Sequence, residues 1–236
     1  MRAIILAAGQ GTRLVSGRPY PKPLQPVAGV PLIVHVLQRL GDGGVTDVAV
    51  VVGYRGGMIR EALTSKSLPT RLHFFDNPQW HLPNGNSLLA ARAFVTEPTF
   101  LVMSDHLWTP ALLQRVADAP LNPNGALLGV DYDIPGCFDL PDATKVRVDG
   151  TRIVEIGKEL PTYDCLDTGV FRITRALLNA LEAANGPDGC SLSAGVGTLA
   201  ERGLMHVADV EDATWLDVDT PEALAEAERR IAKGSL

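Results

Sequence analysis

The sequence is poor in cysteine and has no long apolar run. Its three cysteines, Cys137, Cys165 and Cys190, are widely spaced and odd in number, and none of them belongs to a CxxC pair. This argues against a disulfide framework and against zinc held by clustered thiolates. No apolar run approaches the roughly 18 residues of a membrane helix. The run after Arg2 is too short for a signal peptide and is broken by Gly9. We therefore expect a reduced, soluble, cytoplasmic protein.

Positive charge is also in short supply. The chain has 21 Lys and Arg residues against 27 Asp and Glu residues, a net charge of −6. A non-specific nucleic-acid binder needs a basic face, so the charge balance disfavours such a partner. A small anionic ligand stays compatible, because a few cations focused in a cleft can outweigh the global charge. Hydrophobic residues make up 46% of the 236 residues, enough for a sizeable core.

The first half of the chain alternates between strand and helix patterns. Continuous apolar runs predict buried strands at 2–8, 47–53, 71–75 and 99–104. Helical spacing of apolar residues predicts helices at 31–40, 56–65 and 86–94. Such alternation predicts a parallel sheet with crossover helices.

The second half is less regular. Strands are expected at 125–131, 145–156, 166–173 and 214–219, the second of them as a hairpin that turns at Asp149 and Gly150. Helices are expected at 174–184 and 221–233, capped by Thr174 and Thr220. Since the sequence contains no repeat and no linker, we predict one domain over residues 1–236 whose sheet changes character past about residue 120.

The first predicted strand ends in a glycine-rich loop, GQGTRL at 9–14. Leu14 stands where a dinucleotide-binding fingerprint needs its third glycine, and no Gly-Lys-Ser/Thr sequence follows to complete a P-loop. The loop still offers small residues that permit close backbone approach, exposed N–H groups and the cation of Arg13. Taken alone, these residues are compatible with a phosphate site or with a plain strand–turn.

A second motif, PYPKPL at 19–24, places Lys22 between prolines. The prolines stiffen the backbone and so lower the entropic cost of holding the lysine in one place. A lysine held in this way can neutralise a phosphate as a point charge, whereas the alternative is a solvated lysine in a proline-rich loop. Both motifs fall in a predicted loop over 9–30, and loops of that length tend to be functional.

In this order and spacing, LAAGQGTRL and PKPLQPVAGVPLI resemble the nucleotidyltransferases that make nucleotide-diphosphate sugars and alcohols. The resemblance implies a Rossmann-like three-layer α/β/α fold with a mixed, mostly parallel central sheet. It implies two catalytic residues, Arg13 on the triphosphate of an incoming nucleotide and Lys22 on its α-phosphate. It divides the domain into a nucleotide-binding half, 1–120, and an acceptor-binding half, 121–236. The further nucleotide-binding residues that it implies are Leu6, Ala7, Ala8, Gly9, Gly11, Thr12, Asn84, Gly85, Asn86, Ser87 and Ser104.

The same resemblance implies a Mg²⁺ cofactor. Asp105, at the end of FLVMSDH, matches the metal-binding aspartate of the family, and WLDVDT offers Asp217 and Asp219 as further ligands. Asp217 and Asp219 share a face if the segment is a strand, and carboxylate oxygens suit a hard divalent cation. The alternative roles are a helix cap for Asp219 and a cap or turn residue for Asp105.

Residues 143–171 look most like the cytidylyltransferases that act on inositol 1-phosphate, and NGNSLLAA at 84–91 and MSDH at 103–106 fit that branch. This implies transfer from CTP to a polyol or sugar phosphate, which gives a CDP-alcohol and pyrophosphate. The acceptor-binding residues that it implies are His106, Lys145, Lys158, Asp167, Thr168 and Gly169. Members of the branch are often fused to a membrane phosphotransferase. The 236 residues hold no such half, so we expect that a separate protein uses the product or that none does.

Two other functions stay open on this sequence. The same fold can act on phosphocholine, a phosphonate or a hexose 1-phosphate, with CTP, UTP or GTP. A nucleotide-binding regulatory protein without turnover is the second alternative, although such a protein has no physical reason to keep Arg13, Lys22, Asp105 and Asp217 together. The oligomeric state is left open, with a homodimer as one option.

Overall fold

The fold is described from a computed structural model that covers residues 1–15 and 20–236. Residues 16–19, which include part of the predicted loop and the first proline of PYPKPL, lie outside the described residues. Within the described part, a nine-stranded sheet runs in the order β5-β4-β1-β6-β11-β8-β12-β10-β9. Its strands are β1 Arg2–Ala7, β4 Asp47–Val52, β5 Arg71–Asp76, β6 Thr99–Met103, β8 Ala126–Asp131, β9 Lys145–Asp149, β10 Arg152–Gly157, β11 Cys165–Ile173 and β12 Met205–Asp209.

The first four strands of the sheet are parallel, as the sequence predicts. Strands β1 and β4 are apolar along nearly their whole length because both of their faces are buried. Parallel strands bring their carboxyl ends to one edge of the sheet, so the chain after β1 meets the chain after β6. The backbone N–H of Ser104 donates to Leu6 O at 3.2 Å. This places Gly9 and Asp105 on the same side of the molecule.

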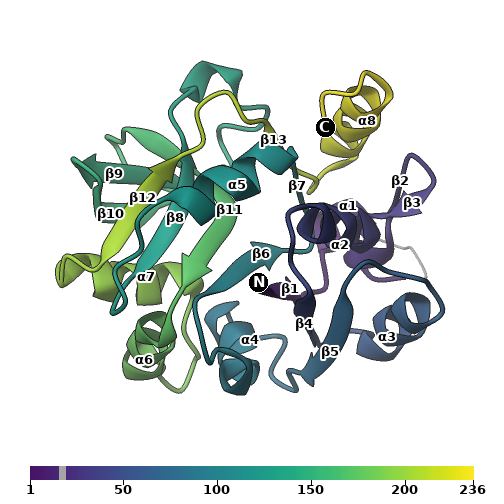
Figure 1. Cartoon of the computed structure of the whole chain (residues 1–236), viewed down its shortest axis with the longest axis horizontal. Helices are drawn as coiled ribbons and strands as arrows, with labels where there is room; N and C mark the ends of the chain where they lie inside the picture. Colours follow the sequence, from purple (N-terminus) through teal and green to yellow (C-terminus); the bar gives the residue numbers. More distant parts are fainter. Residues whose placement is uncertain (16–19) are drawn as a thin grey trace.

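Helices cover both faces of the sheet and complete the three-layer fold that the family resemblance implies (Figure 1). Ala3 and Ile5 of β1 face one core, whereas Ile4 and Leu6 face the other. The first core is covered by α2 Leu32–Asp42, α3 Gly56–Thr64, α5 Pro110–Asp118 and α8 Pro221–Ala232. The second is covered by α4 Gly85–Ala90, α6 Arg175–Ala184 and α7 Leu192–Glu201. No helix in residues 1–15 or 20–236 is both long and apolar enough to cross a bilayer.

The second half of the sheet is mostly antiparallel. Strand β11 runs antiparallel to β6 and β8, and β10 runs antiparallel to β12 and β9, so that β8 with β12 is the parallel exception. The predicted hairpin is confirmed, with Gly150 at φ +61 in its turn. Two short strands, β7 His106–Trp108 and β13 Trp215–Asp217, pair antiparallel outside the main sheet. This pairing joins the segment after β6 to the C-terminal segment.

Several elements differ from the sequence prediction. The expected helix 86–94 is α4 followed by a 3-10 helix, Arg92–Phe94, which turns Phe94 into the second core. The predicted loop contains a short helix, α1 Thr12–Val15, a 3-10 helix, Lys22–Leu24, and a hairpin of β2 Pro26–Val27 with β3 Val30–Pro31. Pro31 caps α2 and does not open it. Helices α5 and α7 and strand β12 have no counterpart in the prediction.

Candidate active site

Lys22 is the central cation of the site. It begins the 3-10 helix after Pro21 and is 4% exposed. Its Nζ lies 2.7 Å from Asp105 Oδ2 and 3.8 Å from Asp217 Oδ1, and it forms an ion pair with Asp219. A buried ammonium group is costly unless carboxylates surround it, which these three aspartates do.

Two distant segments supply these carboxylates. Asp105 lies in the turn between β6 and β7, and Asp217 ends β13 opposite His106 of β7. Asp219 follows β13 directly. The side chain that caps α8 belongs to Thr220, which accepts from the Ala223 N–H, so the cap role is taken by the neighbour of Asp219.

The carboxylates fit a hard divalent cation. Potential ligand atoms of Asp105, His106 and Asp217 lie within 4.8 Å of one another, and so do those of Asp142, Asp217 and Asp219. Asp217 Oδ1 is a buried oxygen without a hydrogen-bond donor in the described residues. Such an atom is normally satisfied by a partner, and carboxylate oxygens are the ligands that Mg²⁺ prefers.

Charges in the cluster shift several pKa values. Burial by itself would raise the pKa of Asp105, but the charges of Lys22 and His106 outweigh burial and hold that pKa well below its ordinary value. Burial raises the pKa of Asp217, and the neighbouring Asp105 carboxylate adds to this. The two carboxylates therefore differ in how readily they ionise.

His106 lies against the backbone of β11. Burial opposes its ionisation, yet the carboxylates of Asp217, Asp105 and Asp167 raise the pKa of His106 to about 9. Burial raises the pKa of Asp167 to about 6, against the hydrogen bond that its Oδ1 accepts from Gly169 at 2.7 Å. Gly169, at φ +76, leaves the space that the imidazole fills. The site thus combines a histidine and a carboxyl group whose pKa values are both raised above their ordinary values.

The glycine-rich loop borders a cavity of about 240 Å³ beside Lys22. Gly11, at φ +64, packs its Cα against the stem of Lys22, where a Cβ would collide with the lysine side chain. Arg13 lines this cavity and forms ion pairs with Asp219 and Asp142. The loop therefore packs against Lys22 and supplies Arg13.

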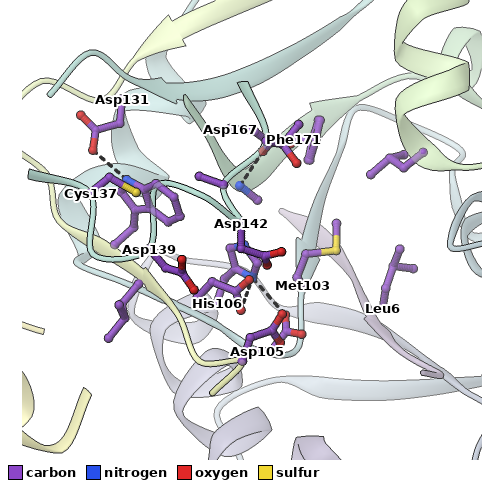
Figure 2. Close-up of a pocket in the computed structure, with 18 of the residues that line it drawn as sticks. Leu6, Met103, Asp105, His106, Asp131, Cys137, Asp139, Asp142, Asp167 and Phe171 are labelled. Carbon is purple, nitrogen blue, oxygen red and sulfur yellow. Dashed lines mark hydrogen bonds and ion pairs between the residues drawn. The ribbon is translucent and has the colours of Figure 1, made fainter. Parts of the chain in front are cut away.

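A larger cavity of about 460 Å³ opens beside the same cluster. Figure 2 shows that its wall has apolar and acidic parts. Leu6 and Met103 lie at one end and Asp131 and Asp139 at the other, with Asp142 between them near His106. A wall of this composition can hold a flat apolar ring at one end and hydroxyl or ammonium groups at the other.

Most of the residues predicted from the sequence line one of the two cavities. They are Leu6, Ala8, Gly9, Gly11, Thr12, Arg13, Lys22, Asn84, Ser87, Ser104, Asp105, His106, Lys158, Asp167, Gly169, Asp217 and Asp219. Arg13, Lys22, Asp105, Asp217 and Asp219 form one connected set of charges.

The structure does not bring Ala7, Gly85, Asn86, Lys145 or Thr168 to either cavity wall. The Asn86 side chain accepts from the Cys190 N–H, and Lys145 Nζ donates to Pro141 O at 3.1 Å. Thr168 Oγ1 donates to Gly129 O at 2.8 Å. These three polar side chains have partners within the fold, and Gly85 lies against the carbonyl of Cys190.

Sequence reasoning missed the loop before β9. Four aspartates fall in residues 131–142, and each of them lines the larger cavity. Asp131 Oδ2 accepts from Trp215 Nε1 at 2.7 Å, and Asp142 pairs with Arg13. The close spacing of these acidic residues at the end of a buried strand could have indicated an acidic wall of the site.

Comparison with known proteins gives matches over the whole chain. Residues 3–135 match the MobA-like NTP transferase domain. The chain is 38% identical over 232 residues to the bifunctional IPC transferase and DIPP synthase of Rubrobacter xylanophilus, which covers 97% of this chain and 51% of that protein. It is 31% identical to the CMP-5'-(3-aminopropyl)phosphonate synthase of Streptomyces rubellomurinus, over 98% of this chain and 39% of that protein. The chain therefore spans about half, or less, of the length of these curated relatives.

A solved structure matches over the full length. The inositol-1-phosphate CTP transferase from T. maritima superimposes with a TM-score of 0.84 at 29% identity, covering 100% of this chain and 97% of that one. The match extends beyond residues 3–135 into the half of the sheet that borders the larger cavity.

Proposed function

Since this chain belongs to the MobA-like NTP transferase family, we propose that it transfers the cytidylyl group of CTP to inositol 1-phosphate. The products would be CDP-inositol and pyrophosphate. The similarity to the IPC transferase and DIPP synthase of Rubrobacter xylanophilus and to the inositol-1-phosphate CTP transferase from T. maritima supports this choice of substrates. We assign the nucleotide to residues 1–120 and the acceptor to residues 121–236.

The observation that carries the proposal is the position of Lys22. It lines the smaller cavity and is buried among Asp105, Asp217 and Asp219, of which Asp105 and Asp219 line both cavities. In the proposed reaction an oxygen of the acceptor phosphate attacks the α-phosphorus of CTP. The bond from that phosphorus to the bridging oxygen breaks, and pyrophosphate leaves with the electron pair. The attacking phosphate is already anionic, so no general base is required.

The residues of the chain would then act by positioning and charge. Arg13 and the backbone N–H groups of Gly9 and Gly11 would hold the outer phosphates in the smaller cavity. Lys22 would neutralise the α-phosphate as its charge grows. Lys158, whose side chain lines the larger cavity, is a better partner for the acceptor phosphate than Lys145, which is turned toward Pro141.

We assign Mg²⁺ to Asp105, Asp217 and Asp219. When bound, Mg²⁺ supplies positive charge that offsets the negative charge developing on the phosphates. Oδ1 of Asp217, which accepts no hydrogen bond within the described residues, favours this assignment.

Carboxylates at the acceptor end of the larger cavity suit a polyol. Each carboxylate can accept hydrogen bonds from two neighbouring hydroxyl groups, and Asp167 and Asp139 line this wall. A site built to bind hydroxyl groups rejects analogues that lack them, because its polar groups are then left unpaired.

A phosphonate acceptor is the second candidate. The similarity to the CMP-5'-(3-aminopropyl)phosphonate synthase of Streptomyces rubellomurinus favours it, and the acidic wall would also suit an ammonium group. Either acceptor leaves the same roles to Lys22 and Arg13.

Release of pyrophosphate tests the proposal. CTP, UTP, ATP and GTP are each paired, with Mg²⁺, with inositol 1-phosphate, glucose 1-phosphate, phosphocholine and 3-aminopropylphosphonate. The proposal predicts release with CTP and inositol 1-phosphate at a rate well above every other pair. Release with 3-aminopropylphosphonate instead would establish the second candidate, and no release with any pair would refute both.

A further inference from the structure

Asp142 joins two segments that carry different cations. It lies in the loop between β8 and β9 and lines the larger cavity (Figure 2). Its Oδ2 is 2.9 Å from Arg13 Nη1, and its Oδ1 is 2.6 Å from Lys158 Nζ. Arg13 belongs to the glycine-rich loop, and Lys158 directly follows β10. One carboxylate therefore bridges a cation on the nucleotide side and a cation on the acceptor side.

The exposure of the three side chains indicates that their ion pairs contribute little to the stability of the fold. Arg13 and Lys158 are 52% and 50% exposed, and Asp142 is 27% exposed. Burial would raise the pKa of Asp142, but its bonds to Lys158 and Arg13 outweigh burial and lower that pKa, so the group is ionised at neutral pH. Exposed ion pairs contribute little to folding stability.

The charge of Asp142 is unfavourable for binding anions. A carboxylate beside two cations lowers the positive potential that attracts phosphates to the site. What its two ion pairs do provide is a link between Arg13 and Lys158. Two reacting phosphates must meet in line, and a displacement of about 1 Å can cost on the order of 100-fold in rate.

We propose that Asp142 is a positioning residue, which fixes Arg13 and Lys158 relative to each other so that the two substrate phosphates meet. This role rests on the proposed function. It differs from that of a metal ligand, although a carboxylate oxygen of Asp142 lies within 4.8 Å of ligand atoms of Asp217 and Asp219. Both oxygens of Asp142 are engaged by Arg13 and Lys158.

The test compares steady-state kinetics of Asp142→Asn with those of the wild-type chain. The variant keeps the size of the side chain and removes its charge. We expect kcat to fall about tenfold, with KM for CTP and for inositol 1-phosphate unchanged or lower. The Mg²⁺ concentration for half-maximal rate should not change. Asp142→Ser is the second variant and should show the same loss of kcat.

Asp149→Asn is the matched control, because Asp149 also forms an exposed ion pair, with Arg152, and lines neither cavity. It should keep the wild-type kcat.

A wild-type kcat in both Asp142 variants would overturn the positioning role, as would KM values that rise with kcat unchanged. A several-fold rise in the Mg²⁺ requirement would make Asp142 a metal ligand instead. A wild-type chain that is inactive with every substrate pair refutes the proposed function and this role together, whereas an active wild type beside fully active variants refutes this role alone.

Discussion

Lys22 shows how a single residue depends on its surroundings. Its ammonium group is buried and would be costly to ionise without counter-charges. Asp105, Asp217 and Asp219 supply them, and Gly11 leaves room for the lysine stem. The residue is thus held where the charge of a phosphate could replace that of a carboxylate.

Removal of this charge should reduce catalysis more than folding. Lys22→Ala is expected to lower kcat at least about 100-fold, since a fixed cation aimed at developing negative charge contributes on that scale. Circular dichroism should show a folded chain. Lys66→Ala alters an exposed lysine that lines neither cavity; it is the control and should retain full activity. Near-normal turnover in Lys22→Ala would exclude the proposed role.

Gly169 should tolerate no side chain, for two separable reasons. Its φ of +76 is unfavourable for other residues, and an added Cβ would lie 2.5 Å from Cδ2 of His106. Gly150→Ala isolates the first reason, because φ there is +61 and nothing lies within 4 Å. We expect Gly150→Ala to lose about 1–2 kcal/mol of unfolding free energy. Gly169→Ala should lose at least about 1 kcal/mol more. If urea titrations show the same loss of unfolding free energy for Gly169→Ala as for Gly150→Ala, the contact with His106 is not tight.

At the scale of elements, helix α2 is attached to the β2–β3 hairpin by His35. Nε2 of His35 lies 2.9 Å from Val27 O, and the side chain is buried. Burial lowers the pKa of His35, with the charge of Arg39 acting in the same direction, against the hydrogen bond to Val27. The neutral ring is therefore the form that the folded chain prefers.

This preference links stability to pH. Below the ordinary histidine pKa of 6.5 the unfolded chain takes up a proton more readily than the folded chain, so the free energy of unfolding falls as pH is lowered. Between pH 7.5 and pH 5.5, the free energy of unfolding measured in urea should therefore fall more for wild type than for His35→Gln. His81→Gln, which alters an exposed histidine, should behave as wild type. Identical losses in wild type and His35→Gln would contradict the assignment.

The sequence predicted elements best where apolar patterns were continuous. Strands β1, β4 and β6 and the hairpin of β9 and β10 follow from such patterns and from turn residues. Helices α5 and α7 were missed, and α7 contains glycines in its interior, which weaken a helical signal. The 3-10 turn after α4 depends on how Phe94 packs in the core, which is a tertiary effect that local sequence does not encode.

At the scale of the whole molecule, the site combines segments from both ends of the chain. The loops after β1 and β6 could be predicted as neighbours, because parallel strands end at one edge of the sheet. The pairing of β7 with β13, which brings Asp217 beside Asp105, depends on contacts more than 100 residues apart along the chain. The bridging position of Asp142 and the structural partners of Asn86, Lys145 and Thr168 likewise follow from tertiary contacts.

A ligand that contacts segments from both ends of the chain should stabilise the whole fold against unfolding. CTP at about 100 times its dissociation constant, with Mg²⁺, is expected to raise the thermal unfolding midpoint by roughly 5–10 °C. With EDTA in place of Mg²⁺ the increase should be smaller. Asp217→Asn should abolish the difference between the two conditions. Equal midpoints with Mg²⁺ and with EDTA in the wild-type chain would contradict a metal site at these aspartates.

The most direct test of the central claim is a phosphorus NMR spectrum of the chain incubated with CTP, inositol 1-phosphate and Mg²⁺. The account predicts that the signals of CTP and inositol 1-phosphate decline together while two coupled diphosphate signals of CDP-inositol and one signal of pyrophosphate appear in equal molar amounts. Unchanged CTP, or CTP consumed without a new diphosphate ester, would contradict nucleotidyl transfer to this acceptor.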